Sequence, residues 1–186
     1  MGILKKLFSR GTSDEPQKAV TNTATSAAKE KAEEVTPVAR LQARVKDYLD
    51  SQGWSYSITS RGDYSFGITI DCDLQRCDLK IVCIDQGIQT VAQAPITIPS
   101  ERRHAMAELV TRANYGLVDG AFEFDFDTGA IQYSTFLFDT NDTLPLEAVE
   151  HSVDTPFLML KKYGNAIVKT ANGIGTPREN VEEAER

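Results

Sequence analysis

The sequence predicts an α+β domain built on an antiparallel sheet of about five or six strands, with helices mainly on one face. Two observations lead to this prediction. Segments with helical spacing of apolar residues flank two groups of segments in which apolar and polar residues alternate. Turn signals of a few residues separate neighbouring strands, and such short connections join antiparallel strands. The expected order is helix, three or four strands, helix, a two-stranded hairpin and a final helix, over residues 37–171.

The first helix is expected to begin at Thr36-Pro37, because threonine is a favoured N-cap and proline is favoured at the first helical position. Gly53 is expected to end it, since glycine readily adopts the left-handed conformation that terminates many helices. The apolar side chains between these signals predict a stripe that faces the core: Val38, Leu41, Val45, Tyr48 and Leu49.

Three or four strands are expected after this helix, over residues 54–59, 64–71, 78–85 and 88–94. In the first two, aromatic and β-branched residues alternate with small polar residues, which is the pattern of a strand with one buried face. Arg61–Asp63 and Gln86-Gly87 supply turns, and Pro95 and Pro99 mark the exit from the fourth strand.

Two further helices are expected. One runs from Ser100, its N-cap, to Asn114-Tyr115-Gly116. The other covers residues 145–171, where Pro156 should kink the helix or split it into two, and where Gly164 would let a neighbouring element approach closely. Residues 172–186 hold four Glu, two Arg and a Pro, and we expect this acidic C-terminal tail to fray.

An aromatic hairpin is expected between these two helices. Its strands, residues 121–126 and 130–136, alternate apolar and polar residues on either side of Asp127-Thr128-Gly129. With a two-residue loop at Thr128-Gly129, Phe124 faces Tyr133 and Phe126 faces Ile131, so the aromatic residues form one apolar wall.

Phe136 and Phe138 fall on the face opposite this wall. Residues 78–84 also carry apolar side chains of both parities, so the sheet is predicted to be partly apolar on both faces. Helices can cover one face, and a second subunit or a bound peptide would cover the other. The alternative is that the terminal helices cover the second face as well. We predict Phe136 and Phe138 as partner-binding residues.

The composition limits the classes of partner. The 186 residues carry a formal net charge of -7, which divides into +1 over residues 1–36 and -8 over the remainder. An acidic body repels phosphate backbones, so nucleic acid is not expected as a partner. Cys72, Cys77 and Cys83 are odd in number and come without an export signal, so we expect reduced thiols and a cytoplasmic protein.

Residues 1–36 are expected to form a basic and amphipathic N-terminal tail. Residues 11–36 nearly lack large apolar side chains, which predicts a disordered tether. In Met1–Arg10, four apolar residues share one side of a helical turn and three basic residues share the other. Two interpretations stay open: a peptide that docks weakly on an anionic membrane or in a protein groove, and an ordinary frayed terminus.

The sequence shows no pattern for catalysis, cofactor binding or metal binding, and we expect no residues with these roles. The three cysteines lack the paired spacing of structural zinc sites, and His104 and His151 lie on predicted helices. There is no Gly-x-Ser-x-Gly elbow and no glycine-rich phosphate loop with a lysine. Glu123, Asp125 and Asp127 alternate on the polar side of a strand, where exposure to solvent explains them.

One segment, Glu108–Asp139, combines the helix end Asn114-Tyr115-Gly116-Leu117, the glycine at Gly120 and the Phe-Glu-Phe/Asp-Thr-Gly/Ile-Gln-Tyr hairpin. With these residues it resembles the YbjN family, and the helix and aromatic strand of Ala39–Trp54 also fit, so the similarity covers about residues 37–170. That family looks like the class I type III secretion chaperones. The resemblance implies the order α-βββ-α-ββ-α and a non-enzymatic, often dimeric domain that binds peptide segments of partner proteins or acts as a regulator.

Three kinds of function follow as expectations. The first is a protein-binding module, chaperone-like or a regulatory adaptor, which forms a homodimer and holds a peptide segment on its second sheet face or at an edge strand. The second is a small-molecule sensor or enzyme, whose pocket would gather convergent polar groups and perturbed carboxylates. The third is an adaptor that is tethered to a membrane through residues 1–10.

Overall fold

The computed structural model describes residues 36–59, 65–72, 74–139 and 144–186. The predictions for the docking peptide Met1–Arg10, for the tether up to residue 35 and for the turn Arg61–Asp63 lie outside the described residues. Within them, no helix combines the length and the apolar character that crossing a bilayer requires.

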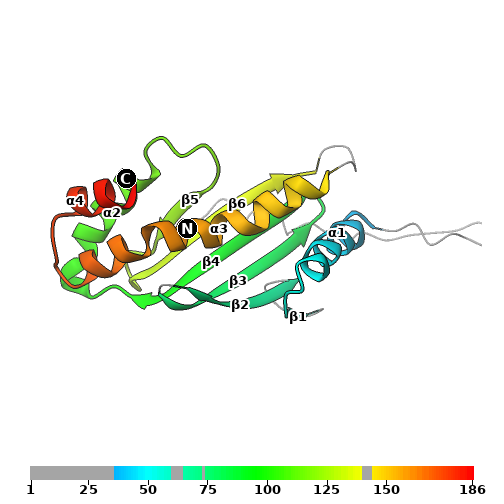
Figure 1. Cartoon of the computed structure of the whole chain (residues 1–186), viewed down its shortest axis with the longest axis horizontal. Coiled ribbons are helices and arrows are strands. Elements are labelled where there is room, and N and C mark those ends of the chain that lie inside the picture. The colour runs from blue at the N-terminus through cyan, green and yellow to red at the C-terminus, as the bar shows by residue number, and fades with distance from the viewer. Residues whose placement is uncertain (1–35, 60–64, 73, 140–143) are drawn as a thin grey trace, which may run out of the picture. The chain divides into compact units, whose positions relative to one another are not determined.

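The fold is α+β, as predicted, with a six-stranded antiparallel sheet in the order β1-β2-β3-β4-β6-β5 (Figure 1). The strands are β1 (Ser57–Ile58), β2 (Phe66–Cys72), β3 (Gln75–Ile84), β4 (Gly87–Thr97), β5 (Ala121–Phe124) and β6 (Ala130–Phe138). The α-helices of the described residues are α1 (Pro37–Ser51), α2 (Arg103–Asn114), α3 (Leu146–Ala171) and α4 (Pro177–Ala184). Helices α1, α2 and α3 lie on one face of the sheet, and α4 packs on α2 and α3.

Helix α1 follows its sequence signals. Thr36 is the N-cap, and its side-chain oxygen accepts a hydrogen bond of 3.2 Å from the main-chain N–H of Ala39. Pro37 occupies the first turn, where a missing N–H costs nothing. The residues of the predicted stripe that become fully buried are Leu41, Val45, Tyr48 and Leu49.

Strand β1 is much shorter than the predicted strand over residues 54–59. The side chains of Trp54 and Tyr56 pack back on neighbouring elements: the Trp54 ring lies 6.2 Å from that of Tyr48, and the Tyr56 ring lies 5.7 Å from that of Phe66. The Tyr56 hydroxyl also donates to Asp50 of α1 at 2.6 Å. These contacts hold residues 54–56 close to α1, which leaves only Ser57 and Ile58 to pair with β2.

Strand β4 continues through Pro95 to Thr97, although Pro95 was predicted to mark its exit. The pairing between β4 and β6 shifts register between Gln93 and Thr97, which is the irregularity that lets a proline without an N–H sit in a strand. The predicted N-cap Ser100 instead begins a short 3₁₀ helix, η2 (Ser100–Arg102), that precedes α2. Its hydroxyl donates to the neighbouring Glu101 carboxylate and caps no backbone N–H.

The aromatic hairpin forms with a register two residues away from the predicted one. Phe122 pairs with Tyr133, and Phe124 pairs with Ile131. The loop is longer than two residues because the Asp125 carboxylate accepts hydrogen bonds from the main-chain N–H groups of residues 127 and 128, at 2.8 and 3.2 Å. A shift of two residues keeps every side chain on its predicted face, but it leaves Phe126 43% exposed in the loop.

Helix α3 is continuous over its 26 residues, so of the two outcomes predicted at Pro156, a kink or a split, the split does not occur. Proline has no N–H to donate to the main-chain oxygen four residues earlier, which belongs to Ser152. A side chain from the sheet fills this vacancy: Thr135 Oγ1 of β6 donates to that oxygen at 2.8 Å. Gly164 permits the expected close approach, since a Cβ at this position would lie 3.1 Å from Leu74 Cγ.

The expected fraying of residues 172–186 is wrong, because residues 177–184 form α4. The helix begins with a capping box in which Thr176 and Glu179 satisfy each other's backbone N–H groups. Val181 is buried, and Asn180 donates from its buried side chain to Thr170 Oγ1 at 2.9 Å. The sequence analysis missed this helix because it relied on composition. The four glutamates make residues 172–186 polar on average, although Val181 is buried.

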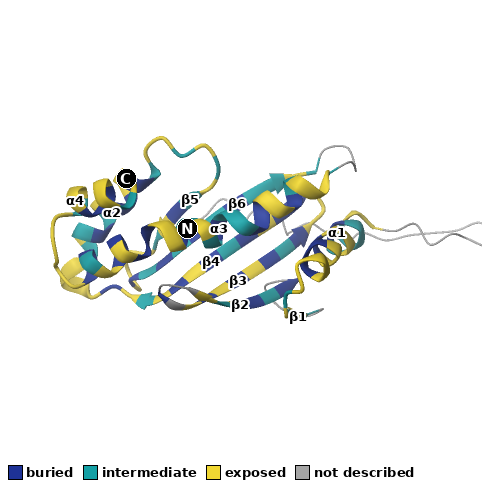
Figure 2. Ribbon diagram, in the orientation of Figure 1, coloured by how far each residue is buried: buried dark blue, intermediate teal, exposed yellow. Residues whose placement is uncertain are grey.

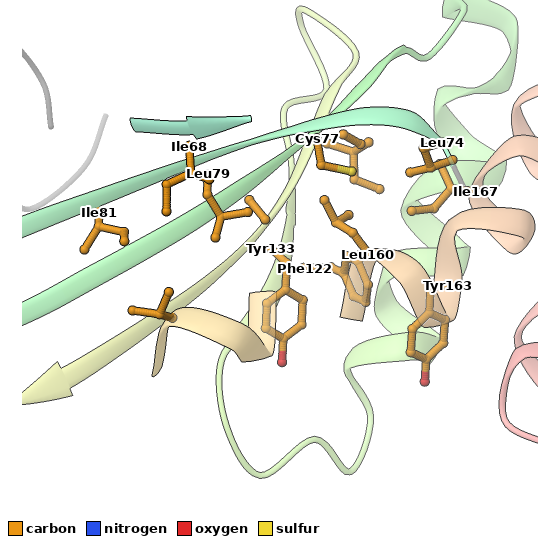
Figure 3. Close-up of a cluster of buried hydrophobic side chains, with 14 of the residues drawn as sticks. Ile68, Leu74, Cys77, Leu79, Ile81, Phe122, Tyr133, Leu160, Tyr163 and Ile167 are labelled. Carbon is orange, nitrogen blue, oxygen red and sulfur yellow. The ribbon is translucent and has the colours of Figure 1, made fainter. Parts of the chain in front are cut away.

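The core lies between the sheet and the helices. Figure 2 shows buried residues alternating with exposed ones along β3 and β4, as half-buried strands require. Figure 3 shows side chains of the sheet, among them Leu79, Phe122 and Tyr133, meeting Leu160 and Tyr163 of α3. The Phe122 ring makes edge contacts with both tyrosines, with ring centres 4.8 and 5.2 Å apart.

The prediction of three reduced thiols is wrong for Cys77, which is disulfide-bonded. Cys83 is a free, buried thiol, and burial raises its pKa to about 11. A thiol with a raised pKa is a poor nucleophile, so Cys83 acts as a small core residue. The cysteine argument for a reducing compartment therefore does not hold for Cys77.

Candidate functional site

The face of the sheet that points away from the helices, here called the outer face, is the surface on which sequence analysis placed Phe136 and Phe138. Along β6, the odd-numbered residues Ile131, Tyr133 and Thr135 are buried toward the helices. The even-numbered residues therefore point outward, and Phe138 is 66% exposed. Both phenylalanines lie on the predicted face, and their role in binding stays a prediction.

Strand register shows which residues join them. Residues that pair across antiparallel strands share a face, so the outward row of Phe138 continues through Gly87 of β4 to Ile84 of β3. The next row runs from Phe136 through Gln89 to Val82, and the third runs from Ser134 through Val91 to Lys80.

These rows give the outer face an apolar end. We define the outer apolar cluster as five residues: Val82, Ile84, Val91, Phe136 and Phe138. The two phenylalanine rings meet edge to face with centres 4.5 Å apart. Phe138 and Ile84 are exposed, and the other three are half-buried by their neighbours on the same face. No described helix covers this cluster, so the alternative that the terminal helices cover the second face is wrong.

The other end of the outer face is polar, and several of its side chains bond laterally. Thr69 donates to Asp78 at 2.9 Å across β2 and β3. Gln132 of β6 donates to the Glu123 carboxylate of β5 at 2.7 Å, and Ser134 donates to the same carboxylate. Polar groups that bond to one another can stay exposed to water without a partner. Burial of the apolar end against a partner is favourable, because it removes apolar surface from water.

The two edges of the sheet differ. At the β5 edge, the Asn114 side chain from α2 donates to the Phe122 main-chain oxygen at 2.9 Å and accepts from the Phe122 N–H at 2.8 Å. Asn114 thus stands in for a neighbouring strand. At the other edge, β1 pairs only with Phe66 and Gly67 of β2. Residues 68–72 of β2 have no strand beside them on that side among the described residues.

A second exposed surface was missed by sequence analysis. The loop after α2 displays Tyr115 and Val118, which are 90% and 102% exposed. The loop is held from behind, because the Tyr133 hydroxyl donates to the Asp119 main-chain oxygen and the Asp119 carboxylate lies 2.9 Å from His151 Nε2. Exposed apolar residues in a predicted turn carry no periodic signal, so no pattern of the sequence could reveal them.

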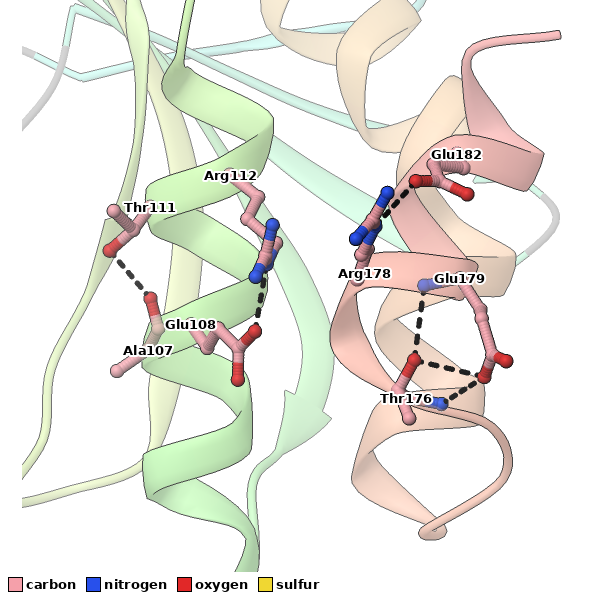
Figure 4. A network of polar contacts seen from close by, with 8 residues as sticks. All are labelled: Ala107, Glu108, Thr111, Arg112, Thr176, Arg178, Glu179 and Glu182. Carbon is pink, nitrogen blue, oxygen red and sulfur yellow. Dashed lines mark hydrogen bonds and ion pairs between the residues drawn. The ribbon is translucent and has the colours of Figure 1, made fainter.

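The hollows of the described surface are open and shallow. One of them, about 500 Å³, is lined by Glu108, Thr111 and Arg112 of α2 and by Tyr115, which follows it. A neighbouring hollow of about 230 Å³ lies between α2 and α4. Figure 4 shows why neither holds free catalytic groups: Arg112 pairs with Glu108 on its own helix, and Arg178 pairs with Glu182, each at 2.7 Å. Such exposed pairs separated by one helical turn are ordinary features of a solvated helix surface.

The carboxyl groups with shifted pKa values do not resemble catalytic acids. The pKa values of Asp50, Asp125 and Glu179 are all lowered, chiefly by hydrogen bonds from Lys46, Thr128 and the Thr176 backbone respectively. A general acid needs a raised pKa, which burial or a like charge would provide. Within the described residues, no three His, Cys, Asp or Glu side chains converge as metal ligands.

No family model matches the sequence, and no curated protein matches it. Among solved structures, the crystal structure of YbjN from E. coli, which is described as a provisional transcription regulator, has a TM-score of 0.47 and 15% sequence identity, over 64% of this chain and 84% of that chain. A likeness this distant transfers no function, so the surface is interpreted from its own residues.

Proposed function

We propose that this chain is a non-enzymatic protein-binding module, of the chaperone or regulatory-adaptor kind, which holds a segment of a partner protein on its outer sheet face. The observation that carries the proposal is the outer apolar cluster, which no described helix covers and in which Ile84 and Phe138 are exposed. A contiguous exposed apolar patch on a folded domain marks an interaction surface more often than a chance feature.

The chemistry of the face indicates the kind of segment that fits. Phe136 and Phe138 form a ridge of two rings with centres 4.5 Å apart. An apolar side chain of the partner would pack beside this ridge, and polar groups of the partner would meet Gln89 at its border. Large aromatic residues in the centre of a contact supply most of the binding free energy in protein complexes.

The open edge of β2 offers a second way to hold the same kind of partner. Because β1 pairs only with Phe66 and Gly67, the backbone groups of residues 68–72 that point toward this edge have no strand partner among the described residues. An extended segment could bond to them as an added strand. Binding on the face depends on the phenylalanine side chains, whereas binding at the edge depends on the backbone, so the two modes are separable by mutation.

The test is cross-linked affinity capture from an extract of the source cells, followed by mass spectrometry. We expect cross-links that map beside β4 and β6, and we expect their loss in Phe136→Ser and Phe138→Ser. Phe126→Ser is the matched control, because Phe126 is also an exposed aromatic residue but lies in the hairpin loop outside the cluster. Capture that is equal in all three variants would refute the outer face as the binding surface.

A further inference from the structure

The outward rows of the outer face change in chemical character along the strands. The first two rows, which end at Phe138 and Phe136, are mainly apolar. The third row contains one charged residue, the exposed Lys80 of β3. The fourth row begins in β3 with Asp78 and ends in β5 with Glu123, and both carboxylates are exposed. Successive rows are therefore apolar, apolar, positive and negative.

The charges of the third and fourth rows are available to a partner. Asp78 accepts a hydrogen bond of 2.9 Å from Thr69, and Glu123 accepts hydrogen bonds from two neutral side chains of β6. Neutral donors leave both carboxylates with their negative charge. Among the described residues, no ion pair includes Lys80, Asp78 or Glu123.

We propose that the partner segment held on the outer face is an extended chain with a fixed order of side chains at every second position: apolar, apolar, acidic and basic. The inference rests on the proposed function, since it gives the chemistry of the partner for the same surface. The two apolar positions lie over the outer apolar cluster, and the two charged positions lie over the third and fourth rows.

The spacing of the rows supports an extended segment. Outward residues of one strand are about 6.8 Å apart, because each residue rises about 3.4 Å and every second side chain points outward. An extended partner that runs along the strands presents side chains at the same interval, so one side chain meets each row. A helix presents one face about every 5.4 Å, so across four rows it would be about 4 Å out of step.

The order of charges supports the acidic and basic positions. An acidic side chain over the third row meets the ammonium group of Lys80, and a basic side chain over the fourth row lies between Asp78 and Glu123. A segment above β4 and β6 is displaced by about 7 Å from β3 and from β5, which long charged side chains can span. Opposite charges across an interface fix register and select partners more than they add affinity. Exchange of the acidic and basic positions would place like charges together in both rows.

The probe is a synthetic, fluorescently labelled peptide, Thr-Leu-Thr-Phe-Thr-Glu-Thr-Lys-Thr. Its threonines favour an extended chain, and its other residues follow the order of the rows. The control peptide exchanges Glu and Lys, so it has the same composition, length and net charge. Because a segment can run in either direction along the strands, both peptides are also made with reversed sequences. The direction that binds the probe more tightly is used for the comparison.

Fluorescence anisotropy with the full chain measures the affinities. We expect the probe to bind about ten-fold more tightly than the control peptide, because the exchange replaces attraction by repulsion in two rows. Phe138→Ser should weaken binding of the probe at least about ten-fold, and Phe126→Ser should leave it unchanged. Equal affinities for the two peptides, or no binding of either one, would overturn the proposal.

Exchange of two charges in the protein tests which residues select the peptide. In the double variant Asp78→Lys with Lys80→Asp, the control peptide should bind more tightly than the probe. Lys161→Glu is the matched control, because it reverses an exposed charge on α3, on the other side of the sheet. It should leave the preference for the probe unchanged. A preference for the probe that survives in the double variant would overturn the role of Lys80 and Asp78.

Circular dichroism shows whether the double variant is folded. If it is not, Lys80→Gln removes one exposed charge alone and should reduce the preference for the probe by a smaller factor. An unchanged preference in Lys80→Gln would count against the proposal in the same way.

The outcomes separate this proposal from the proposed function. Equal affinities for the two peptides, together with cross-linked capture that depends on Phe136 and Phe138, would reject the charge pattern and leave the protein-binding function standing. Capture that is indifferent to both phenylalanines, with no binding of either peptide, would reject both. Sedimentation velocity identifies another occupant: a two-chain mass that Phe138→Ser abolishes would assign the face to a second copy and overturn the proposal.

Discussion

Thr135 donates a hydrogen bond of 2.8 Å from its side chain on β6 to the main-chain oxygen of Ser152 on α3. Both residues are buried, and the Ser152 oxygen is the one that Pro156 leaves without a helical donor. A residue of the sheet thus repairs the helix at its proline, which keeps α3 continuous.

This relationship predicts a coupling between two distant positions. Thr135→Val removes the donor and leaves a buried carbonyl unsatisfied, so we expect it to lower the free energy of unfolding by about 1–3 kcal/mol. In a Pro156→Ala background, residue 156 supplies the missing N–H, and the same change at Thr135 should cost about 1 kcal/mol less. Urea unfolding of the four variants measures the cycle. Equal costs in both backgrounds would mean that Thr135 does not serve the Ser152 oxygen.

The side chain of Asn114 should stabilise the fold more than an ordinary polar side chain at a helix end. Its side chain makes both hydrogen bonds to the Phe122 backbone, so Asn114→Ala should lower the free energy of unfolding by about 1–3 kcal/mol. Asn114→Asp keeps the acceptor and loses the donor, and its cost should exceed that of the exposed control Thr111→Ala. Urea unfolding compares the three variants. A loss of unfolding free energy at Asn114 no larger than that at Thr111 would contradict a stabilising role for the two Asn114–Phe122 hydrogen bonds.

Helix α4 should be protected from hydrogen exchange. Thr176→Ala removes the capping box, and we expect it to cost about 1 kcal/mol and to speed amide exchange in residues 179–184. Arg178→Ala removes only an exposed ion pair and should change exchange little. Mass-spectrometric hydrogen exchange reads both variants. Rapid exchange of these amides in the unmodified chain would support a frayed end and refute the docked helix.

Three buried tyrosines predict a loss of stability at high pH. Burial raises the pKa values of Tyr48 and Tyr163, which also donate to Asp154 and Glu185, and it raises that of Tyr133 to about 12. A raised pKa means that the folded state holds its protons longer than the unfolded state, whose tyrosine pKa is 10.0. The stabilisation is thus complete below pH 10.0 and is lost as the pH rises through the folded values.

The measurement is ultraviolet titration of tyrosine ionisation, run together with circular dichroism. We expect some tyrosines to ionise near their ordinary pKa, and the buried ones to ionise only as the fold is lost. Simultaneous ionisation of all tyrosines near pH 10 with the fold intact would contradict the prediction.

The order of elements and the two faces of the sheet could be predicted because they depend on periodicity. Alternation along residues 130–138 assigned Phe136 and Phe138 to the outer face without knowledge of the helices, and four of the five residues predicted for the α1 stripe are buried. The register of the hairpin could not be predicted, because the Asp125 side chain decides the loop length through bonds that no alternation records.

Other features were hidden because they depend on contacts between distant segments. Nothing near Pro156 reveals that Thr135 will replace its missing donor, and nothing near Asn114 reveals that it will bond to Phe122. The capping box at Thr176 is a local signal that was present in the sequence but outweighed by the acidic composition around it.

The two edges of the sheet differ in whether their backbone groups are already bonded, and this difference limits how many copies of the sheet could join edge to edge. Asn114 hydrogen-bonds to the outward N–H and C=O of Phe122, whereas residues 68–72 of β2 have no strand beside them at that edge among the described residues. A sheet that can be extended at one edge only would stop after joining one neighbour. Both outer edges of the joined sheet would then be β5 edges, where Asn114 already bonds to the backbone of Phe122. Polymerisation into filaments through sheet edges requires two open edges per unit, and the described part of this domain presents one.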